Sequence, residues 1–221
     1  MTSAFRIPQL DLSSRRHYRW GQLYGCSYGL AVRKAALSVD SPILVMVSGN
    51  QMLDELLDQL SFFEESEHLP ILSFPDWETL PYDIFSPHQD IVSQRLEALY
   101  TLPMLKHGLV ITTTATAMQR IAPMEYVQSK ALVLNRGERL DLDNFRLQLG
   151  AAGYYSVPKV SEHGEFAVRG SLVDLFPTGN EKPFRIDLFD DEIESIKIFD
   201  PETQISIEET DSIRLLPARE Y

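Results

Sequence analysis

Residues 183–200 read PFRIDLFDDEIESIKIFD, and they predict the architecture of the C-terminal part of the chain. Apolar and polar side chains alternate on either side of Asp190-Asp191, a dipeptide suited to a hairpin turn. Such alternation is typical of strands with one buried and one solvated face, because successive side chains point to opposite sides of a sheet. The stretch therefore predicts an antiparallel sheet with one wet face.

The first strand of this hairpin places an aromatic ring on its polar face. In PFRIDLF, period two puts Phe189 on the same side as Arg185. An exposed aromatic ring beside an arginine is typical of a protein-binding hot spot, since both side chains bury large areas on association. The neighbouring segment FAVRGSLVDLF (166–176) adds Arg169, followed by Gly170, and a glycine within a strand indicates a bulge or a close backbone approach.

Periodicity alone leaves an equal alternative for these residues. Phe189 could turn inward at the end of its strand, while Arg169 and Arg185 pair with the many nearby carboxylates.

The N-terminal part has the pattern of an α/β layer. The apolar run ILVMV (43–47) predicts a strand buried on both faces, as in a parallel sheet. Leucines at helical spacing follow over residues 52–60, and further strands are predicted at 71–74 and 109–113. Alternating strands and helices predict a layered sheet with right-handed crossovers.

A proline-rich loop and a change in sequence pattern divide the chain into two parts. The stretch 74–90 contains three prolines, and we expect Ser86 to cap a following helix whose first position is Pro87. Beyond Pro123 the segments become short and glycine-punctuated, with one helix predicted at 143–149. The boundary between two modules is predicted near residues 121–127.

Composition favours a globular protein that binds other proteins. The 221 residues are 44% hydrophobic, which supports a buried core, and the net charge of −12 opposes non-specific binding to nucleic acid. The single cysteine, Cys26, allows no intrachain disulfide and fits a reducing cytoplasm. The longest apolar run is too short to cross a bilayer, so no membrane partner is expected.

Basic residues nevertheless concentrate near the N-terminus, where they suggest direct DNA binding as a lower-ranked alternative. The side chains concerned are Arg15, Arg16, Arg19, Arg33 and Lys34.

The segment GCSYG (25–29) matches the G-x-S-x-G pattern of serine hydrolases, which makes Ser27 a candidate nucleophile. The pattern requires a strand leading into the serine, and the basic, aromatic residues 15–24 do not predict one. A phosphate-binding loop is disfavoured as well, because Leu30 stands where such a loop has lysine. We therefore expect a helix start or packing segment, without catalytic, cofactor-binding or metal-binding residues; a cryptic hydrolase or ATPase using residues 25–34 is the alternative function.

Three longer stretches resemble one protein family. They are FPDWETLPYDIFSPHQDIVSQRLEALYTLP (74–103), EHGEFAVRGSLVDLFPTG (162–179) and PFRIDLFDDEIESIKIFD (183–200). Together they resemble the N-terminal, UvrB-like region of the bacterial transcription-repair coupling factors (Mfd), which binds the damage-recognition ATPase UvrA. In that family the UvrA-docking surface uses two arginines and a phenylalanine, and the resemblance implies these roles for Arg169, Arg185 and Phe189.

The resemblance also implies a domain plan. Residues 1–124 would form a UvrB domain 1a-like α/β module without a Walker A loop, and residues 125–215 a strand-rich α+β, domain 2-like module. Residues 216–221 would begin a domain 1b-like segment or tail. Longer family members add parts that bind RNA polymerase, move on DNA and mask the UvrA site through a C-terminal regulatory domain. The chain is therefore expected to be a non-catalytic fragment that recruits nucleotide excision repair.

Overall fold

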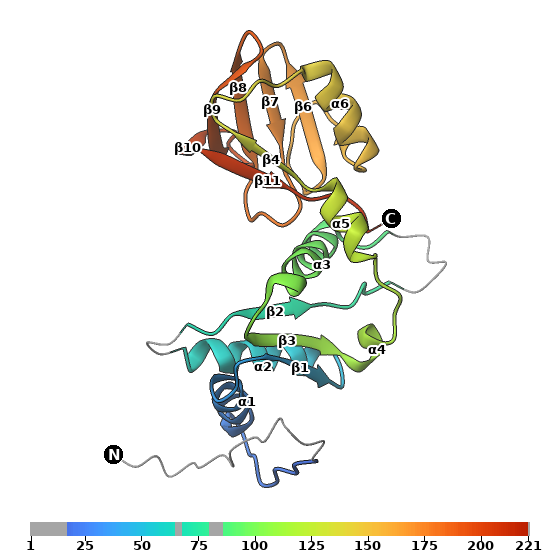
Figure 1. Cartoon of the computed structure of the whole chain (residues 1–221), viewed down its shortest axis with the longest axis vertical. Helices are drawn as coiled ribbons and strands as arrows, with labels where there is room; N and C mark the ends of the chain where they lie inside the picture. The colour runs from blue at the N-terminus through green and yellow to red at the C-terminus, as the bar shows by residue number, and fades with distance from the viewer. Residues whose placement is uncertain (1–16, 65–67, 80–85, 221) are drawn as a thin grey trace. The chain divides into compact units, whose positions relative to one another are not determined.

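The computed structural model describes residues 17–64, 68–79 and 86–220, and it confirms a mixed α/β chain (Figure 1). The chain divides into two compact units, each discontinuous in sequence. The first contains Met1–Asp76 and Met104–Gln119, and the second contains Trp77–Pro103 and Arg120–Tyr221. The predicted UvrB-like domain boundaries stay a prediction.

The first unit is built on a parallel sheet. The strands β1 (Pro42–Val47), β3 (Gly108–Thr113) and β2 (Ile71–Phe74) lie in the order β1-β3-β2, with β3 central. The helices α1 (Ser27–Leu37) and α2 (Asn50–Phe62) pack on one face of this sheet, and the short α4 (Thr114–Ala117) follows β3. The strands predicted at 71–74 and 109–113 are thus confirmed, as is the helix over 52–60.

The core of this unit fills the space between the sheet and its two helices. Val45 and Val47 on β1 meet Leu53, Leu56 and Leu60, which recur at helical spacing on α2. The other face of β1 differs from the prediction, because Leu44 and Met46 are 58% and 55% exposed. The expectation that 43–47 is buried on both faces was wrong: β1 is an edge strand, and only β3 is buried at every position.

Close packing of α1 against α2 depends on a residue without a side chain. A Cβ atom built on Gly29 would lie 2.6 Å from Gln59 Cβ, a separation that van der Waals repulsion forbids. The Gly29 N–H donates to Gln59 Oε1 at 2.9 Å, which fixes the two helices in this close arrangement.

We expect Gly29→Ala to lower the free energy of unfolding of the first unit by about 1–3 kcal/mol, because the overlap outweighs the gain in helix propensity. Urea denaturation followed by circular dichroism measures the change. Gly21→Ala is the matched control, since no atom of the described residues lies within 4 Å of its added Cβ. Equal stability of the two variants would contradict the packing described for α1 and α2.

A six-stranded sheet dominates the second unit, in the order β10-β9-β8-β7-β6-β5 (Figure 1). All neighbours are antiparallel except β5 and β6. The strands are β5 (Tyr155–Ser156), β6 (Glu165–Arg169), β7 (Leu172–Leu175), β8 (Phe184–Phe189), β9 (Glu192–Phe199) and β10 (Ser206–Thr210).

Smaller elements complete this unit. The strands β4 and β11 pair as a separate two-stranded ribbon. Helix α6 corresponds to the helix predicted at 143–149, but it begins one residue earlier and ends two residues later. The elements are α3 (Gln89–Thr101), the 3-10 turn η1 (Leu102–Met104, which crosses between the units), α5 (Met124–Lys130), β4 (Leu132–Asn135), α6 (Leu142–Ala151) and β11 (Ser212–Leu215).

One face of the six-stranded sheet is covered by α6 and by the β4–β11 ribbon. Phe145 and Leu149 of α6 and Ile213 and Leu215 of β11 join the buried residues of the sheet in one core cluster. On β8, the alternate residues Phe184, Ile186 and Leu188 face this core, as their spacing predicts. The antiparallel sheet and the hairpin turn at Asp190-Asp191 are confirmed by the pairing of Phe189 with Glu192.

Two details of these strands differ from the simple pattern. Between the pairs Asp187–Ser195 and Leu188–Ile193, β9 carries one extra residue, Glu194, and this bulge lets residues three apart on β9 both face the core. Gly170 marks neither a bulge nor a close approach: no atom lies within 4 Å of an added Cβ. It instead adopts φ +62° in the two-residue turn between β6 and β7, a conformation that glycine adopts without strain.

Helix α3 belongs to the second unit because of polar side chains as well as apolar ones. Arg95 and Glu220 form a completely buried ion pair with Nε and Oε1 2.5 Å apart. Ser93 Oγ accepts from the Gly179 N–H at 2.8 Å, and Asp90 contacts His163 Nδ1 at 2.8 Å. The expected cap is wrong: His88, not Ser86, is the N-cap, and its ring accepts from the Asp90 N–H.

Replacing Glu220 by glutamine should destabilise the second unit by about 3–5 kcal/mol, since the buried guanidinium of Arg95 would lose its ion pair with Glu220. Thermal unfolding in parallel with Asp143→Asn tests this. Asp143 pairs with Arg146 at the surface, where its side chain is 94% exposed, so its loss should cost less than about 1 kcal/mol. Similar small losses in both variants would show that the buried pair does not secure α3.

None of the helices in the described ranges is sufficiently long and apolar to pass through a bilayer.

Candidate functional site

The outer face of the six-stranded sheet, opposite α6, carries a buried carboxylate bound by two arginines. Asp174 on β7 is 1% exposed and lies directly opposite Arg185 on β8. Arg185 donates from Nε to Asp174 Oδ1 at 2.7 Å and from Nη2 to Oδ2 at 3.0 Å, a two-pronged contact that fixes the plane of the guanidinium. Arg169 on β6 donates from Nη2 to the same Oδ2.

The two arginines differ in how much of each side chain is available to solvent. Arg185 is held on three sides, since its Nη1 also donates to the Gln204 carbonyl at 3.2 Å and its Cζ lies 4.9 Å from the ring centroid of buried Phe199. Its side chain is 21% exposed, against 52% for Arg169. The hydrogen bond to Asp174 raises the pKa of Arg185 above its ordinary value.

Phe189 shares this face and points outward. It lies four residues beyond Arg185 on β8, roughly 13 Å along the strand, and it is 70% exposed. The strand register places Arg169 in the row between them, because Arg169 pairs with Leu172 and Leu172 pairs with Asp187. The structure therefore brings Arg169, Arg185 and Phe189 onto one face in three successive rows; we call these three residues the arginine–phenylalanine patch.

Each of the two sequence interpretations is right about part of this face. Both arginines do pair with a carboxylate, as the alternative proposed, but that carboxylate is the single buried Asp174. Phe189 does not turn inward. Asp174, Phe199 and Gln204 were missed as supporting residues, and the register of the β6–β7 hairpin is the signal that could have found Asp174.

A turn after β9 supplies the carbonyl that holds Arg185. Asp200 Oδ1 accepts from the Glu202 N–H at 3.1 Å and from the Thr203 N–H and Oγ1 at 2.7 and 2.9 Å. Gln204 adopts φ +63° and is held there by its side chain, which donates to the Val160 and Pro201 carbonyls. The turn thereby fixes the position of the Gln204 oxygen.

The hydrogen bonds from Thr203 lower the pKa of Asp200 below its ordinary value of 3.8. Because the folded-state pKa is depressed, the contribution of Asp200 to stability is present above the unfolded pKa and lost as pH falls through the folded one. NMR titration should show the amide signals of Glu202 and Thr203 shifting with a midpoint below pH 3.8. Asp200→Asn should abolish this titration, and a midpoint at or above 3.8 would contradict the hydrogen bonds described.

The GCSYG segment forms the start of a helix and its packing surface, as expected. Residues 17–24 contain no strand, so the lead-in that a serine nucleophile requires is missing from the described chain. Ser27 begins α1 and its Oγ donates to the Tyr24 carbonyl at 2.7 Å. At the same helix start, the Gly29 N–H donates to Gln59, so this donor is not available to a phosphate group.

The N-terminal basic residues differ in exposure within the described chain, where Lys34 is partly exposed. Arg33 is 4% exposed, whereas Arg19 is exposed. Arg15 and Arg16, which the DNA-binding alternative also invoked, lie outside the described residues.

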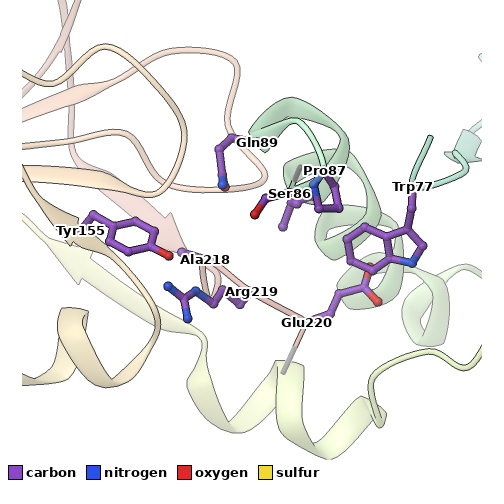
Figure 2. A pocket seen from close by; sticks show the side chains of 9 residues that line it. Trp77, Ser86, Pro87, Gln89, Tyr155, Ala218, Arg219 and Glu220 are labelled. Carbon is purple, nitrogen blue, oxygen red and sulfur yellow. The ribbon is translucent and has the colours of Figure 1, made fainter. Parts of the chain in front are cut away.

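A cleft of about 330 Å³ lies elsewhere in the second unit (Figure 2). Its Glu220 carboxylate binds Arg95, and Arg219 Cζ lies 4.8 Å from the Tyr155 ring centroid, so these charged groups already have partners. No histidine or cysteine is among the described residues that line the cleft, which therefore offers no imidazole or thiol for catalysis. The lining residues are Trp77, Ser86, Pro87, Gln89, Val92, Tyr155, Ala218, Arg219 and Glu220.

Metal binding has no support in the described ranges, where no three His, Cys, Asp or Glu side chains gather in a way that could hold an ion.

Comparison with known proteins relates this chain to DNA-repair factors. The model of the UvrB interaction domain family matches residues 132–221, which include the whole arginine–phenylalanine patch and indicate a protein partner. Over 201 residues, 91% of the chain, the sequence is 44% identical to the transcription-repair-coupling factor of Escherichia coli (strain K12), of which it covers 17%.

Two further relatives are described in the same words. The chain is 43% identical over all its 221 residues to the transcription-repair-coupling factor of Haemophilus influenzae, covering 19% of it. It is 28% identical over 198 residues, 90% of the chain, to that of Bacillus subtilis, covering 17%. The chain spans less than a fifth of the length of these relatives.

Proposed function

Because the predicted resemblance to the transcription-repair coupling factors is confirmed over the length of the chain, we propose that this protein is a cytoplasmic adaptor that binds UvrA. Binding through Arg169, Arg185 and Phe189 would recruit nucleotide excision repair to RNA polymerase stalled at DNA damage. The residue roles come from the family resemblance.

One observation carries the proposal: the three residues implied by the resemblance share one face of one sheet, within the matched segment 132–221. Arg169 lies on β6, and Arg185 and Phe189 lie on β8, with β7 between these two strands. The strand pairing therefore brings together residues that are up to 20 positions apart in the sequence. Phe189 and Arg169 are both exposed, and Phe189 lies at the end of the patch, with both arginines on the same side of it. This arrangement supports a docking surface over a role in the core.

The chemistry of the patch defines the complementary surface. Phe189 is 70% exposed, so its ring leaves a large apolar area in contact with water. Removing this area from water contributes favourable free energy only when a partner covers it. Two guanidinium groups share one carboxylate, so the three groups carry a net charge of +1 on a chain whose total is −12. The partner surface should therefore combine an apolar pocket with carboxylate groups.

The first unit is proposed to be non-catalytic. By the resemblance, residues 1–124 would form a UvrB domain 1a-like module without a phosphate loop and residues 125–215 a domain 2-like module. Residues 216–221 would be the start of a domain 1b-like segment or a tail. The contact between Gly29 and Gln59 supports the loss of phosphate binding. By the same resemblance, the C-terminal regulatory domain of the longer family members is proposed as a partner of this region. DNA and RNA polymerase are proposed to bind to other parts of those longer proteins.

Phe189→Ala should weaken binding of the full chain to purified UvrA by tenfold or more, since truncation of a hot-spot aromatic costs about 2 kcal/mol or more. Isothermal titration calorimetry measures the dissociation constant. Phe62→Ala is the matched control, because it removes the same side chain from an equally solvent-exposed position, 80%, in the first unit.

Arg169→Ala should act in the same direction, with Arg146→Ala on α6 as its control. The side chains of these two arginines are 52% and 49% exposed, but Arg146 lies on the helix that covers the opposite face. Wild-type affinity in both Phe189→Ala and Arg169→Ala would refute the proposed surface.

A further inference from the structure

The side chains of the patch are held by Asp174, a residue to which the family resemblance assigns no role. Asp174 is the buried acceptor for both arginines and projects from β7, between the strands that carry them. Burying a carboxylate is costly unless charged partners compensate it, so the placement of the two guanidinium groups follows from this one side chain.

The number of N–H groups that remain without a hydrogen-bond partner among the described residues differs between the two arginines. Each guanidinium has five N–H groups. Within the described structure, Arg185 uses three of them, one on Nε, one on Nη2 and one on Nη1, whereas Arg169 uses one. Four of the five N–H groups of Arg169 thus have no partner among the described residues, on a side chain that is 52% exposed, while Arg185 is held by Asp174, Gln204 and the ring of Phe199.

We propose that Asp174 is a positioning residue for partner recognition: it holds Arg185 as a fixed support and orients Arg169 to donate a pair of hydrogen bonds to a carboxylate of the partner. This inference rests on the proposed function, since it assigns a division of labour within the same patch. A planar fork suits a carboxylate because two parallel N–H groups match its two oxygens.

A positioning role and a simple charge effect predict opposite outcomes. Removing the Asp174 charge makes the patch more positive, which by itself would strengthen attraction to an acidic partner. If Asp174 orients the arginines, the same change should weaken binding, because both side chains would have to be ordered on association.

The test measures the affinity of the full chain for purified UvrA. Asp174→Asn keeps the size of the side chain and removes its charge, and we expect a loss of affinity on the order of tenfold. Asp187→Asn is the matched control: it makes the same charge change on the same face of β8, and no described hydrogen bond or ion pair joins Asp187 to either arginine. Its affinity should be unchanged or higher.

A double-mutant cycle separates positioning from a general loss of structure. In an Arg169→Ala background, Asp174→Asn should have a smaller effect than in the wild type, because one of the two side chains that Asp174 orders is gone. Equal effects in both backgrounds, or tighter binding by Asp174→Asn, would overturn the proposal.

Arg169→Lys provides a second variant in case Asp174→Asn unfolds. It keeps the positive charge at a half-exposed position, and its affinity should fall nearly as far as that of Arg169→Ala, since an ammonium group lacks the planar fork. Wild-type affinity of Arg169→Lys would refute carboxylate recognition by a fork. If Arg169→Ala and Phe189→Ala also bound normally, the proposed function itself would fail, so the two failures are distinguishable.

Discussion

The burial of one carboxylate determines how the outer face of the six-stranded sheet is arranged. Asp174 sits in the middle of β7, flanked along the chain by two residues of the core, Val173 and Leu175. Its charge can be accommodated there only with compensating donors on the adjacent strands, and both adjacent strands supply an arginine. The presence of the two arginines on this face and the orientation of Arg185 thus follow from a requirement of folding.

This requirement gives the face a property that surface arginines usually lack. Long charged side chains in solvent lose rotamer freedom when they bind a partner, and that loss offsets part of the gain. Arg185 has lost much of this freedom already, because its guanidinium contacts Asp174, Gln204 and Phe199 in the folded chain. A surface organised in this way can bind with less ordering cost, which is what a recognition site requires.

Local periodicity in the sequence was sufficient to predict the strands β1, β2 and β3, the helices α2 and α6, and the orientation of β8. It did not predict α5, β4 or β5. Alternation placed Arg185 and Phe189 on one face, since a strand's side-chain period does not depend on its neighbours. Alternation failed on β9, where the extra residue Glu194 shifts the period, and on β1, where an apolar run proved to be an edge strand with Leu44 and Met46 exposed. Burial depends on what covers a strand, and a run of apolar residues does not contain that information.

The contacts that could not be predicted join residues distant in sequence. Arg95 and Glu220 are 125 positions apart, and Ser93 and Gly179 are 86 apart, so no local pattern relates them. Asp174 is an intermediate case. Had Gly170-Ser171 been recognised as a two-residue turn, the register would have paired Arg169 with Leu172 and placed Asp174 on the same face as Arg169.

The two units use their charged and polar groups in different ways, and this difference favours recognition over catalysis. At the start of α1, the Gly29 N–H, a donor that could bind an anion at a helix N-terminus, donates to the protein's own Gln59. On the outer face of the second unit, Arg169 is half exposed with a single hydrogen bond among the described residues, and the ring of Phe189 is 70% exposed. Groups that have a partner within the chain stabilise the fold. Groups that are held in position without a partner can contribute favourable free energy only when another molecule binds to them. The second condition is met at the arginine–phenylalanine patch, and that is why we assign the function of the chain to this surface.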